Sequence, residues 1–320
     1  MTKSEQNKLQ NLQKYVANKI IGQKKLTESI IVCLLSNGHV LIEGLPGLAK
    51  TTAAKAISEG IEGDFRRVQF TPDLLPSDLI GTEIYNHDKG DFSFRQGPIF
   101  NNIILADEIN RAPAKVQSAL LEAMEENQIT VGHKTYPLPE LYMVLATQNP
   151  IEQEGTYNLP EAQMDRFLMH IEVKYPSQEE EFQVINLMEL NQKNTTSKNL
   201  ITTQKELFSA RKSCSDIFIS DNLKKYAISL IDASRYPAKY DQDLAQWITI
   251  GASPRATLAI IKCAKSLAWI RGNDCVTPTH IKDVSHNILR HRISLSFDAQ
   301  SDEISKNQVI DRILKTVAIP

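Results

Sequence analysis

Nine consecutive residues have the composition of a loop that binds a phosphate chain. Two glycines, a lysine and hydroxyls stand between a short apolar run (residues 39–42) and an alanine-rich stretch (residues 53–56). In a strand–turn–helix arrangement, backbone N–H groups of the turn and of the helix N-terminus would point at an anion. Lys50 could then reach the β- and γ-phosphates, and the Thr51 hydroxyl could bind Mg²⁺. The nine residues are Gly44, Leu45, Pro46, Gly47, Leu48, Ala49, Lys50, Thr51 and Thr52.

One position departs from the P-loop pattern G-x-x-x-x-G-K-[ST]. The pattern has glycine directly before the lysine, whereas this chain has Ala49. Alanine disfavours the positive φ that glycine adopts freely. The loop by itself therefore leaves both a phosphate site and an ordinary turn open.

Two adjacent carboxylates, Asp107 and Glu108, follow an unbroken apolar run at residues 103–106. Such a run is typical of a parallel strand covered on both faces, and open α/β sheets bind ligands at the carboxyl ends of their strands. Asp107 could bind Mg²⁺, directly or through water, and Glu108 could polarise an attacking water. The alternative is an acidic pair favoured by a helix N-terminus. Because Lys50 lies 57 residues upstream (107 − 50), the pair is interpreted as part of the same site.

A polar amide, Asn149, follows another apolar run at residues 141–146 and could hold the attacking water. In isolation it is an ordinary Asn-Pro turn. The elements that must position these groups are predicted from periodicity and turn residues. We expect two helices within residues 5–37, connected near residues 20–23, and a helix over residues 113–127. Strands are expected at residues 39–42, 65–70, 103–106, 141–146 and 167–173, with hairpins over residues 82–98 and 128–136.

The pattern changes after residue 176. Ser177 and Glu180 form a capping-box start for a helix, and helical stripes follow without a convincing strand. The predicted fold is therefore α/β, a parallel sheet flanked by helices with two hairpin inserts (residues 1–176), followed by a smaller all-α domain (residues 177–320). His280, His286 and His291 lack the spacing of helical metal ligands and are interpreted as solvated or capping side chains.

Composition excludes several classes of protein. The 320 residues are 42% hydrophobic and 23% charged, with a formal net charge of −2. These values are typical of a soluble globular protein and give no reason to expect a nucleic-acid partner. The polar N-terminus and the absence of an apolar run near 18 residues predict neither a signal peptide nor a membrane span, hence a cytoplasmic location. Buried free thiols are predicted for the scattered cysteines, Cys33, Cys214, Cys263 and Cys275.

At this point the chain resembles the MoxR family of AAA+ ATPases, over nearly its whole length. Six ordered segments carry the resemblance, and together they are far more specific than one loop. Alanine before the lysine is usual in this family, so Ala49 supports the resemblance. The segments are residues 44–51, 105–113, 146–150, 154–157, 159–167 and 251–256.

The resemblance implies a role for each matching residue. The loop lysine and Thr51 match Walker A, and the carboxylate pair matches Walker B, with ATP and Mg²⁺ as cofactors. Asn149 matches the sensor 1 amide and Arg255 the sensor 2 arginine of the lid. Arg166 matches the arginine finger that reaches the γ-phosphate held by the neighbouring subunit; from its residue type alone it would be a surface ion pair. Ile21 and Gly22 match the region near adenine.

The implied function is Mg²⁺-ATP hydrolysis in a ring, usually a homo-hexamer, that remodels or matures a partner protein. Family members often work with von Willebrand factor A domain proteins, which would here be a separate chain. The alternative is a nucleotide-gated assembly scaffold with negligible hydrolysis, although Glu108 beside Asp107 counts against it. A motor on DNA or RNA is disfavoured by the near-neutral charge.

Overall fold

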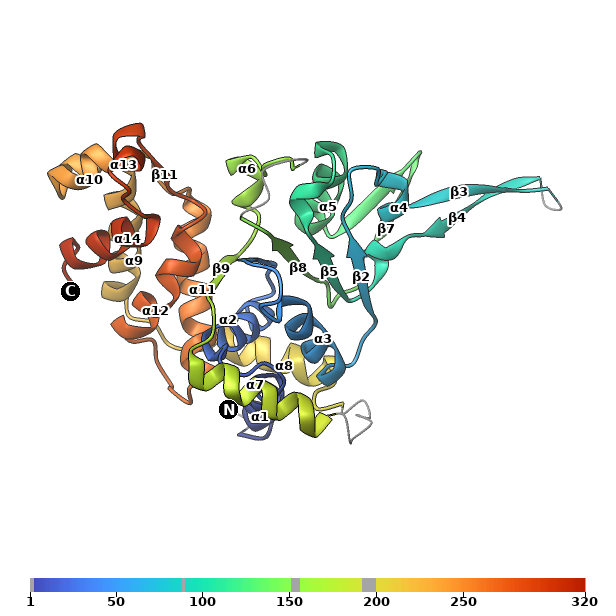
Figure 1. The fold of residues 1–320 in the computed structure, drawn as a ribbon, viewed down its shortest axis with the longest axis horizontal. Helices are drawn as coiled ribbons and strands as arrows, with labels where there is room; N and C mark the ends of the chain where they lie inside the picture. The colour runs from blue at the N-terminus through green and yellow to red at the C-terminus, as the bar shows by residue number, and fades with distance from the viewer. Residues whose placement is uncertain (1–2, 88–89, 151–155, 192–199, 320) are drawn as a thin grey trace.

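A five-stranded parallel sheet lies at the centre of the computed structural model, which describes residues 3–87, 90–150, 156–191 and 200–319 (Figure 1). The strand order is β2-β5-β8-β1-β9. Each strand overlaps one of the five predicted strands, so the parallel α/β core is confirmed. Residues 154 and 155, which belong to one of the six segments that carry the family resemblance, lie outside the described residues. The strands are β1 (Val40–Gly44), β2 (Phe65–Gln69), β5 (Ile103–Asp107), β8 (Met143–Gln148) and β9 (Met169–Val173).

Both faces of the inner strands β1, β5 and β8 are buried, which explains their apolar runs. Successive strand residues point to opposite faces, so Ile104 and Ala106 of β5 pack into one hydrophobic cluster while Ile103 and Leu105 pack into another. Helix α5 (Ala114–Glu126) contributes to the first cluster. The second cluster includes the predicted N-terminal helices and the helix after the glycine-rich loop, α1 (Lys3–Lys19), α2 (Lys24–Leu35) and α3 (Lys50–Gly60).

Because the strands are parallel, their carboxyl ends meet at one edge of the sheet. β1 is paired with β8, and β8 with β5. Their last residues are Gly44, Gln148 and Asp107. The loops that follow these strands begin side by side, and they carry the candidate residues predicted above.

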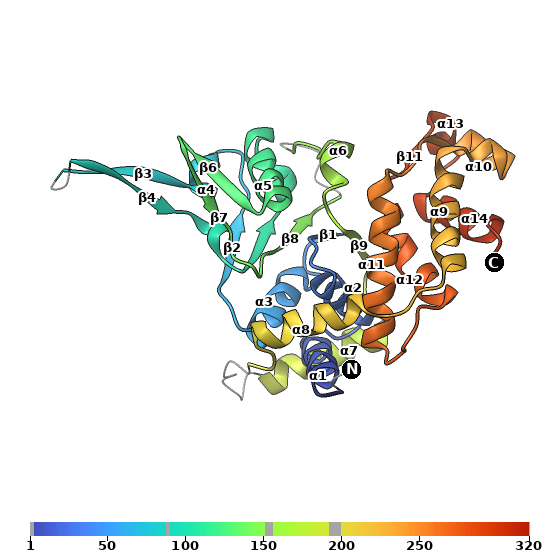
Figure 2. The same ribbon diagram turned by 180° about the vertical axis from the view of Figure 1, so that it is seen from behind.

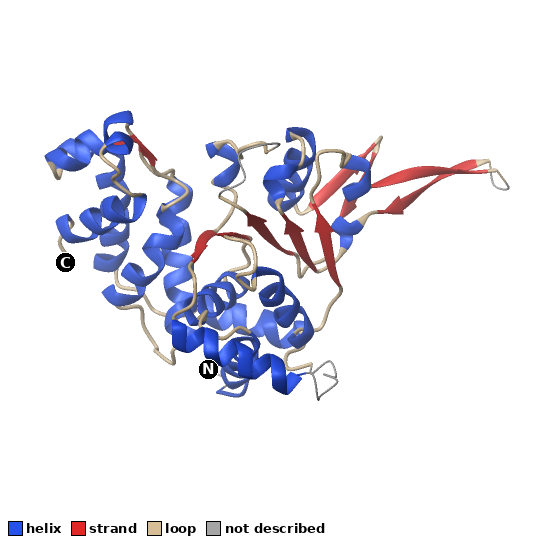
Figure 3. Ribbon diagram, in the orientation of Figure 1, coloured by secondary structure: helices blue, strands red, loops and turns tan. Residues whose placement is uncertain are grey.

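Both predicted hairpins are present and extend away from the sheet (Figure 3). Helix α4 (Pro76–Ile80) precedes the longer one, in which β3 (Gly81–Asn86) pairs with β4 (Asp91–Gln96). The shorter pairs β6 (Gln128–Val131) with β7 (Lys134–Pro137). The rings of Phe94 and Tyr136 lie with their centroids 4.5 Å apart, so an aromatic contact joins the two hairpins.

The region after residue 176 is helical, as predicted. Its first helix, α7 (Gln178–Asn191), has the expected cap, since the Ser177 N–H donates to Glu180 Oε2 at 2.8 Å. One feature was missed: β10 (Ile248–Ile250) pairs with β11 (Ser294–Leu295), strands too short to show alternation. Short α6 (Glu161–Met164) precedes this region. The other helices are α8 (Gln204–Ser215), α9 (Asp221–Arg235), α10 (Gln242–Trp247), α11 (Pro254–Ile270), α12 (Pro278–Leu289), α13 (Phe297–Ser301) and α14 (Lys306–Thr316).

Helix α8 lies apart from most of the later helices. Seen from behind, it lies beside α1, and it contacts α1, α2 and α11 (Figure 2). The hydrophobic cluster of α1 and α2 continues into α8, α9, α11 and α12. Since this cluster crosses residue 176, the boundary between residues 1–176 and 177–320 stays a prediction.

Two predictions about single side chains need correction. Cys33, Cys214 and Cys263 are buried thiols as expected, but Cys275 is exposed because it lies in the loop between α11 and α12. His280 caps α12 by accepting from the Thr277 N–H at 3.0 Å. His291, in contrast, is buried rather than solvated, with Nε2 3.0 Å from the Phe167 carbonyl oxygen. Among the described helices, none is both long and apolar enough to cross a membrane.

Candidate active site

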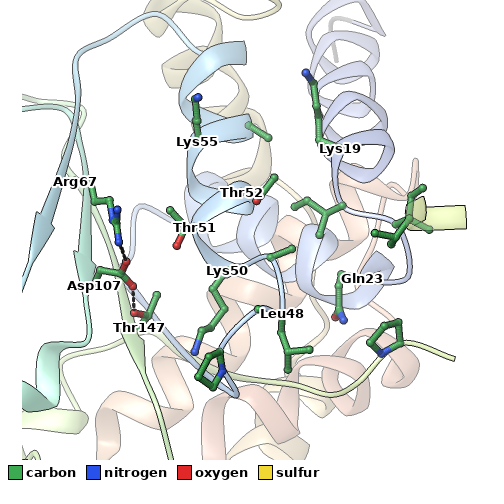
Figure 4. A pocket seen from close by; sticks show the side chains of 18 of the residues that line it. Lys19, Gln23, Leu48, Lys50, Thr51, Thr52, Lys55, Arg67, Asp107 and Thr147 are labelled. Carbon is green, nitrogen blue, oxygen red and sulfur yellow. Dashed lines mark hydrogen bonds and ion pairs between the residues drawn. The ribbon is translucent and has the colours of Figure 1, made fainter. Parts of the chain in front are cut away.

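A pocket of about 900 Å³ opens at the carboxyl edge of the sheet, between the glycine-rich loop, β5, β8 and the turn after α1 (Figure 4). Most of the predicted site residues converge on it. Those that line it are Ile21, Pro46, Gly47, Leu48, Ala49, Lys50, Thr51, Thr52, Asp107, Glu108 and Asn149. Gly44, Leu45 and Gly22 adjoin this set in the chain, whereas Arg166 and Arg255 belong to a different cavity.

The glycine-rich loop leaves β1 and turns into α3 at Lys50. Gly47 has φ +83°, which favours glycine, and a Cβ placed there would meet nothing within 4 Å. The backbone is therefore open on the side where a phosphate would approach. The Lys50 ammonium donates to the carbonyl oxygens of Gly44 and Gln148, the latter at 3.3 Å, and so bridges the ends of β1 and β8.

Ala49 adopts the left-handed conformation that the P-loop glycine would supply, with φ 57° and ψ 18°. For an L-residue this conformation costs roughly 1–2 kcal/mol. The departure from the pattern therefore changes the residue but not the backbone shape of the loop.

We expect Ala49→Gly to raise the free energy of unfolding by about 1 kcal/mol, because glycine removes the left-handed strain. The same change at Ala53, inside α3, should lower it by about 1 kcal/mol, since glycine weakens a helix interior. Urea titration of both variants measures the two values. If Ala49→Gly were no more stable than the wild type, the prediction that the left-handed backbone at Ala49 is strained would be wrong.

Asp107 is nearly buried, and both of its carboxylate oxygens have partners (Figure 4). The Thr147 hydroxyl donates to Oδ1 at 2.6 Å. Arg67 donates to Oδ2 through Nε at 3.0 Å and through Nη2 at 2.7 Å. Sequence reasoning missed both partners. The register β2–β5 brings Arg67 of β2 beside this carboxylate, and such a pairing cannot be read from one sequence.

Glu108 lies at the entrance of the turn after β5, with a left-handed φ of 57°. Its N–H donates to the Thr147 hydroxyl oxygen at 2.9 Å, so one hydroxyl holds both acidic residues. Its Oε2 accepts from Gln69 Nε2 at 2.8 Å and lies 3.1 Å from Arg111 Nε. The carboxylate is thus fixed at the pocket wall, where it could act on a water.

Asn149 is buried, with 5% of its surface exposed, and it lines the pocket directly after β8. It follows β8, which pairs with β5, the strand that ends at Asp107. This position is compatible with holding a water or a phosphate oxygen.

Apolar side chains from two segments also line the pocket. They are Ile20 and Ile21 from the turn after α1 and Val184 and Ile185 of α7, and they could contact a flat base. A Cβ at Gly22 would lie 2.9 Å from Glu180 Cδ, so the glycine lets α7 approach the turn. The sequence predicted the turn but not the contribution of α7.

Arg166 and Arg255 meet at one carboxylate away from this pocket. Arg166 Nη1 lies 3.0 Å from Glu125 Oε2 and donates to the Leu121 carbonyl oxygen at 2.8 Å. Arg255 donates to the other oxygen, Glu125 Oε1. Within this chain each arginine is an ion-pair partner, as the residue type alone suggested for Arg166. Both line a separate cavity of about 340 Å³.

The segments that carry the two arginines are tied together. Asp165, next to Arg166, accepts from Ser253 Oγ at 2.9 Å and pairs with Arg292 Nε at 2.6 Å. Ser253 caps α11, in whose first turn Arg255 stands. Burial lowers the pKa of Arg292, and the Asp165 carboxylate opposes that shift. Sequence reasoning missed this buried pair.

His39 also lines this cavity. Burial lowers its pKa to about 4, so the imidazole is neutral near pH 7. Its Nδ1 accepts from the Val144 N–H at 3.0 Å, which leaves Nε2–H to donate to the Met124 carbonyl oxygen at 3.2 Å. The neutral ring therefore fixes the end of α5, next to Glu125, against the sheet.

The main pocket fits a magnesium nucleotide. The Thr51 hydroxyl and the Asp107 carboxylate are hard oxygen donors of the kind Mg²⁺ prefers. No group of three or more His, Cys, Asp or Glu suitable for a metal occurs in the part of the chain that the structure describes. Mg²⁺ is commonly bound by one or two protein oxygens together with phosphates and water, so this donor set suits a metal that arrives with a nucleotide.

Comparisons with known proteins agree with this geometry. Residues 39–169 match the family model described as "ATPase family associated with various cellular activities (AAA)", and residues 242–313 match the AAA lid domain. Chaperone MoxR1 of Mycobacterium tuberculosis is 48% identical over 302 residues, which cover 94% of this chain and 79% of that protein. Protein MoxR of Paracoccus denitrificans is 30% identical over 94% of this chain and 93% of its own length.

A solved structure extends the likeness to the whole fold. The crystal structure of a protein from Cytophaga hutchinsonii superimposes with a TM-score of 0.91 at 45% sequence identity. The match covers 99% of this chain and 96% of that one. The sheet, the hairpins and the later helices therefore belong to one shared architecture.

Proposed function

The chain belongs to the MoxR family of AAA+ ATPases, and from this premise we propose that it hydrolyses Mg²⁺-ATP in an oligomeric ring to remodel or mature a partner protein. The observation that carries the proposal is the convergence of Lys50, Thr51, Asp107 and Glu108 on one pocket. A phosphate-binding loop alone would fit many nucleotide binders. The carboxylate pair beside it supplies what hydrolysis needs in addition.

Each residue has a defined task in this proposal. Loop amides and the Lys50 ammonium hold the phosphates, and Ile21 with α7 holds the base. Thr51 and Asp107 would hold Mg²⁺, which when bound would offset charge on the phosphate oxygens. Glu108 takes the proton of the attacking water as general base, while Asn149 orients that water.

Arg166 and Arg255 act, in this proposal, on the pocket of a neighbouring subunit. Both lie outside their own pocket and share Glu125 on a different part of the surface. A guanidinium can neutralise the charge that develops on the transferred phosphoryl group. Hydrolysis would then depend on assembly, for which we propose a homo-hexamer.

The partner is proposed to be a protein. The 48% identical relative from Mycobacterium tuberculosis is named a chaperone, and the net charge of −2 gives no support for a nucleic-acid groove. A von Willebrand factor A domain protein on a separate chain is one candidate for the partner. We place this activity in the cytoplasm.

The Lys50→Ala variant tests the nucleotide site. Loss of the ammonium removes a charged hydrogen-bond donor, so ATP binding should weaken roughly 10- to 100-fold. Equilibrium binding of a fluorescent ATP analogue measures it, and Lys115→Ala, an exposed lysine of α5 outside the pocket, is the matched control. Steady-state phosphate release from the wild type is the second readout. Tight ATP binding and ring assembly without phosphate release would favour the scaffold alternative instead.

A further inference from the structure

We propose that Arg67 competes with Mg²⁺ for Asp107, so that the metal enters the pocket only when this guanidinium leaves the carboxylate. Arg67 would then be a positioning residue of the reaction, one that sets how much Mg²⁺ the nucleotide site requires. The inference rests on the proposed function, because it takes the metal to arrive with ATP at Asp107.

Hydrogen bonds already occupy most of the Asp107 carboxylate. A carboxylate offers about four acceptor positions on its two oxygens. Arg67 fills two at Oδ2, with Nε at 3.0 Å and Nη2 at 2.7 Å, and Thr147 fills one at Oδ1. The Asp107 side chain is only 11% exposed. Little of the carboxylate is therefore left for a metal while Arg67 stays in place.

The positive charge of Arg67 also opposes a metal ion at Asp107. Arg67 is permanently cationic and lines the same pocket as Asp107. Its contact neutralises the carboxylate that would attract Mg²⁺. A divalent ion at Asp107 would also lie within a few ångströms of a like charge, in a partly buried place where repulsion is weakly screened. The two cations therefore exclude one another.

The Arg67 side chain has room to move away from Asp107. Its side chain is 51% exposed, and β2 is an edge strand of the sheet. Its other partner is Gln69 Oε1, at 2.8 Å to Nη2, on the same face of β2. That amide also donates to Glu108 at 2.8 Å. Arg67 can thus leave Asp107 without unpacking the core.

The test is the Mg²⁺ dependence of nucleotide binding. A fluorescent ATP analogue is titrated onto the full chain over a series of Mg²⁺ concentrations. In Arg67→Ala, the Mg²⁺ concentration that gives half-maximal binding should fall roughly three- to tenfold, the range for a partly exposed ion pair in which two N–H groups donate to one carboxylate oxygen. The Mg²⁺ concentration that gives half-maximal binding in Arg67→Lys should lie between the values for Arg67→Ala and the wild type. Arg66→Ala, an exposed arginine on the opposite face of β2, should match the wild type.

An unchanged or higher Mg²⁺ requirement in Arg67→Ala would overturn the inference; a higher one would mean that Arg67 assists binding. Both results would leave the proposed function standing, since the wild type would still bind Mg²⁺-nucleotide. Failure of the wild type to bind nucleotide at any Mg²⁺ concentration would instead contradict the proposed function. Thermal unfolding of each variant confirms that the compared proteins are folded.

Discussion

Glu108→Gln should bind ATP as the wild type does and release phosphate at least about 100-fold more slowly. A general base accelerates a reaction roughly 10²- to 10⁴-fold. Glutamine has the same shape but cannot take a proton from water. The backbone N–H of residue 108 would still donate to Thr147, so the turn should keep its form. ATP binding depends on Lys50 and the loop and should therefore be unaffected.

Two measurements on the same preparation test this expectation: equilibrium ATP binding and steady-state phosphate release. Glu122→Gln, an exposed glutamate of α5, is the matched control and should behave as the wild type. If Glu108→Gln released phosphate at the wild-type rate, Glu108 would not be the general base.

Arg166→Ala should release phosphate at least about 1,000-fold more slowly than the wild type, which is the lower end of the effect of an arginine finger on the rate. Its ATP affinity should be unchanged. Arg166 does not line the pocket of its own chain, so its loss should not disturb the bound nucleotide there. The Glu125 carboxylate would retain Arg255 as a partner, which keeps the local fold intact.

Arg312→Ala is the control for the loss of an arginine that is paired with carboxylates. Arg312 pairs with Asp241 and Asp243 and lies outside the pocket, so its loss should leave turnover unchanged. A weaker ATP affinity in Arg166→Ala, with assembly intact, would mean that the arginine serves its own subunit.

Much of this site could be predicted because its parts are local. The inner strands β1, β5 and β8 contain apolar runs, since both faces of these strands are buried, and the acidic pair and Asn149 come at or directly after the ends of two of them. Strand ends meet at one edge in a parallel sheet, which brings Lys50, Asp107 and Asn149 together. The loop was ambiguous only at Ala49, where the structure has the left-handed φ of 57° that glycine would supply.

The parts that could not be predicted depend on register and packing. Arg67 and Thr147 reach Asp107 from neighbouring strands, and no local pattern shows which residues stand opposite each other. Val184 and Ile185 of α7 line the pocket together with Ile20 and Ile21, although the two segments are far apart in the chain. The strands β10 and β11 have three and two residues, so their pairing leaves no periodic signal.

The position of Arg255 is the most informative of these contacts. The resemblance assigns Arg255 to the lid. In the structure, Arg255 and Arg166 both contact Glu125, although the two arginines are 89 residues apart in the chain (255 − 166). Ser253 and Asp165 hold the same two segments together at 2.9 Å. This arrangement is compatible with both arginines reaching a neighbour's nucleotide as a unit.

The central claim, that one subunit binds ATP and its neighbour supplies the arginine for hydrolysis, is tested most directly by mixing two inactive variants. Lys50→Ala subunits have an intact Arg166 but a defective pocket, and Arg166→Ala subunits have the reverse. When the two are assembled together, some interfaces combine an intact pocket with an intact arginine. At an ATP concentration that Lys50→Ala does not bind, we predict that the mixture releases phosphate faster than either variant alone. Confirmed mixed assembly without any recovery would contradict a site shared between subunits.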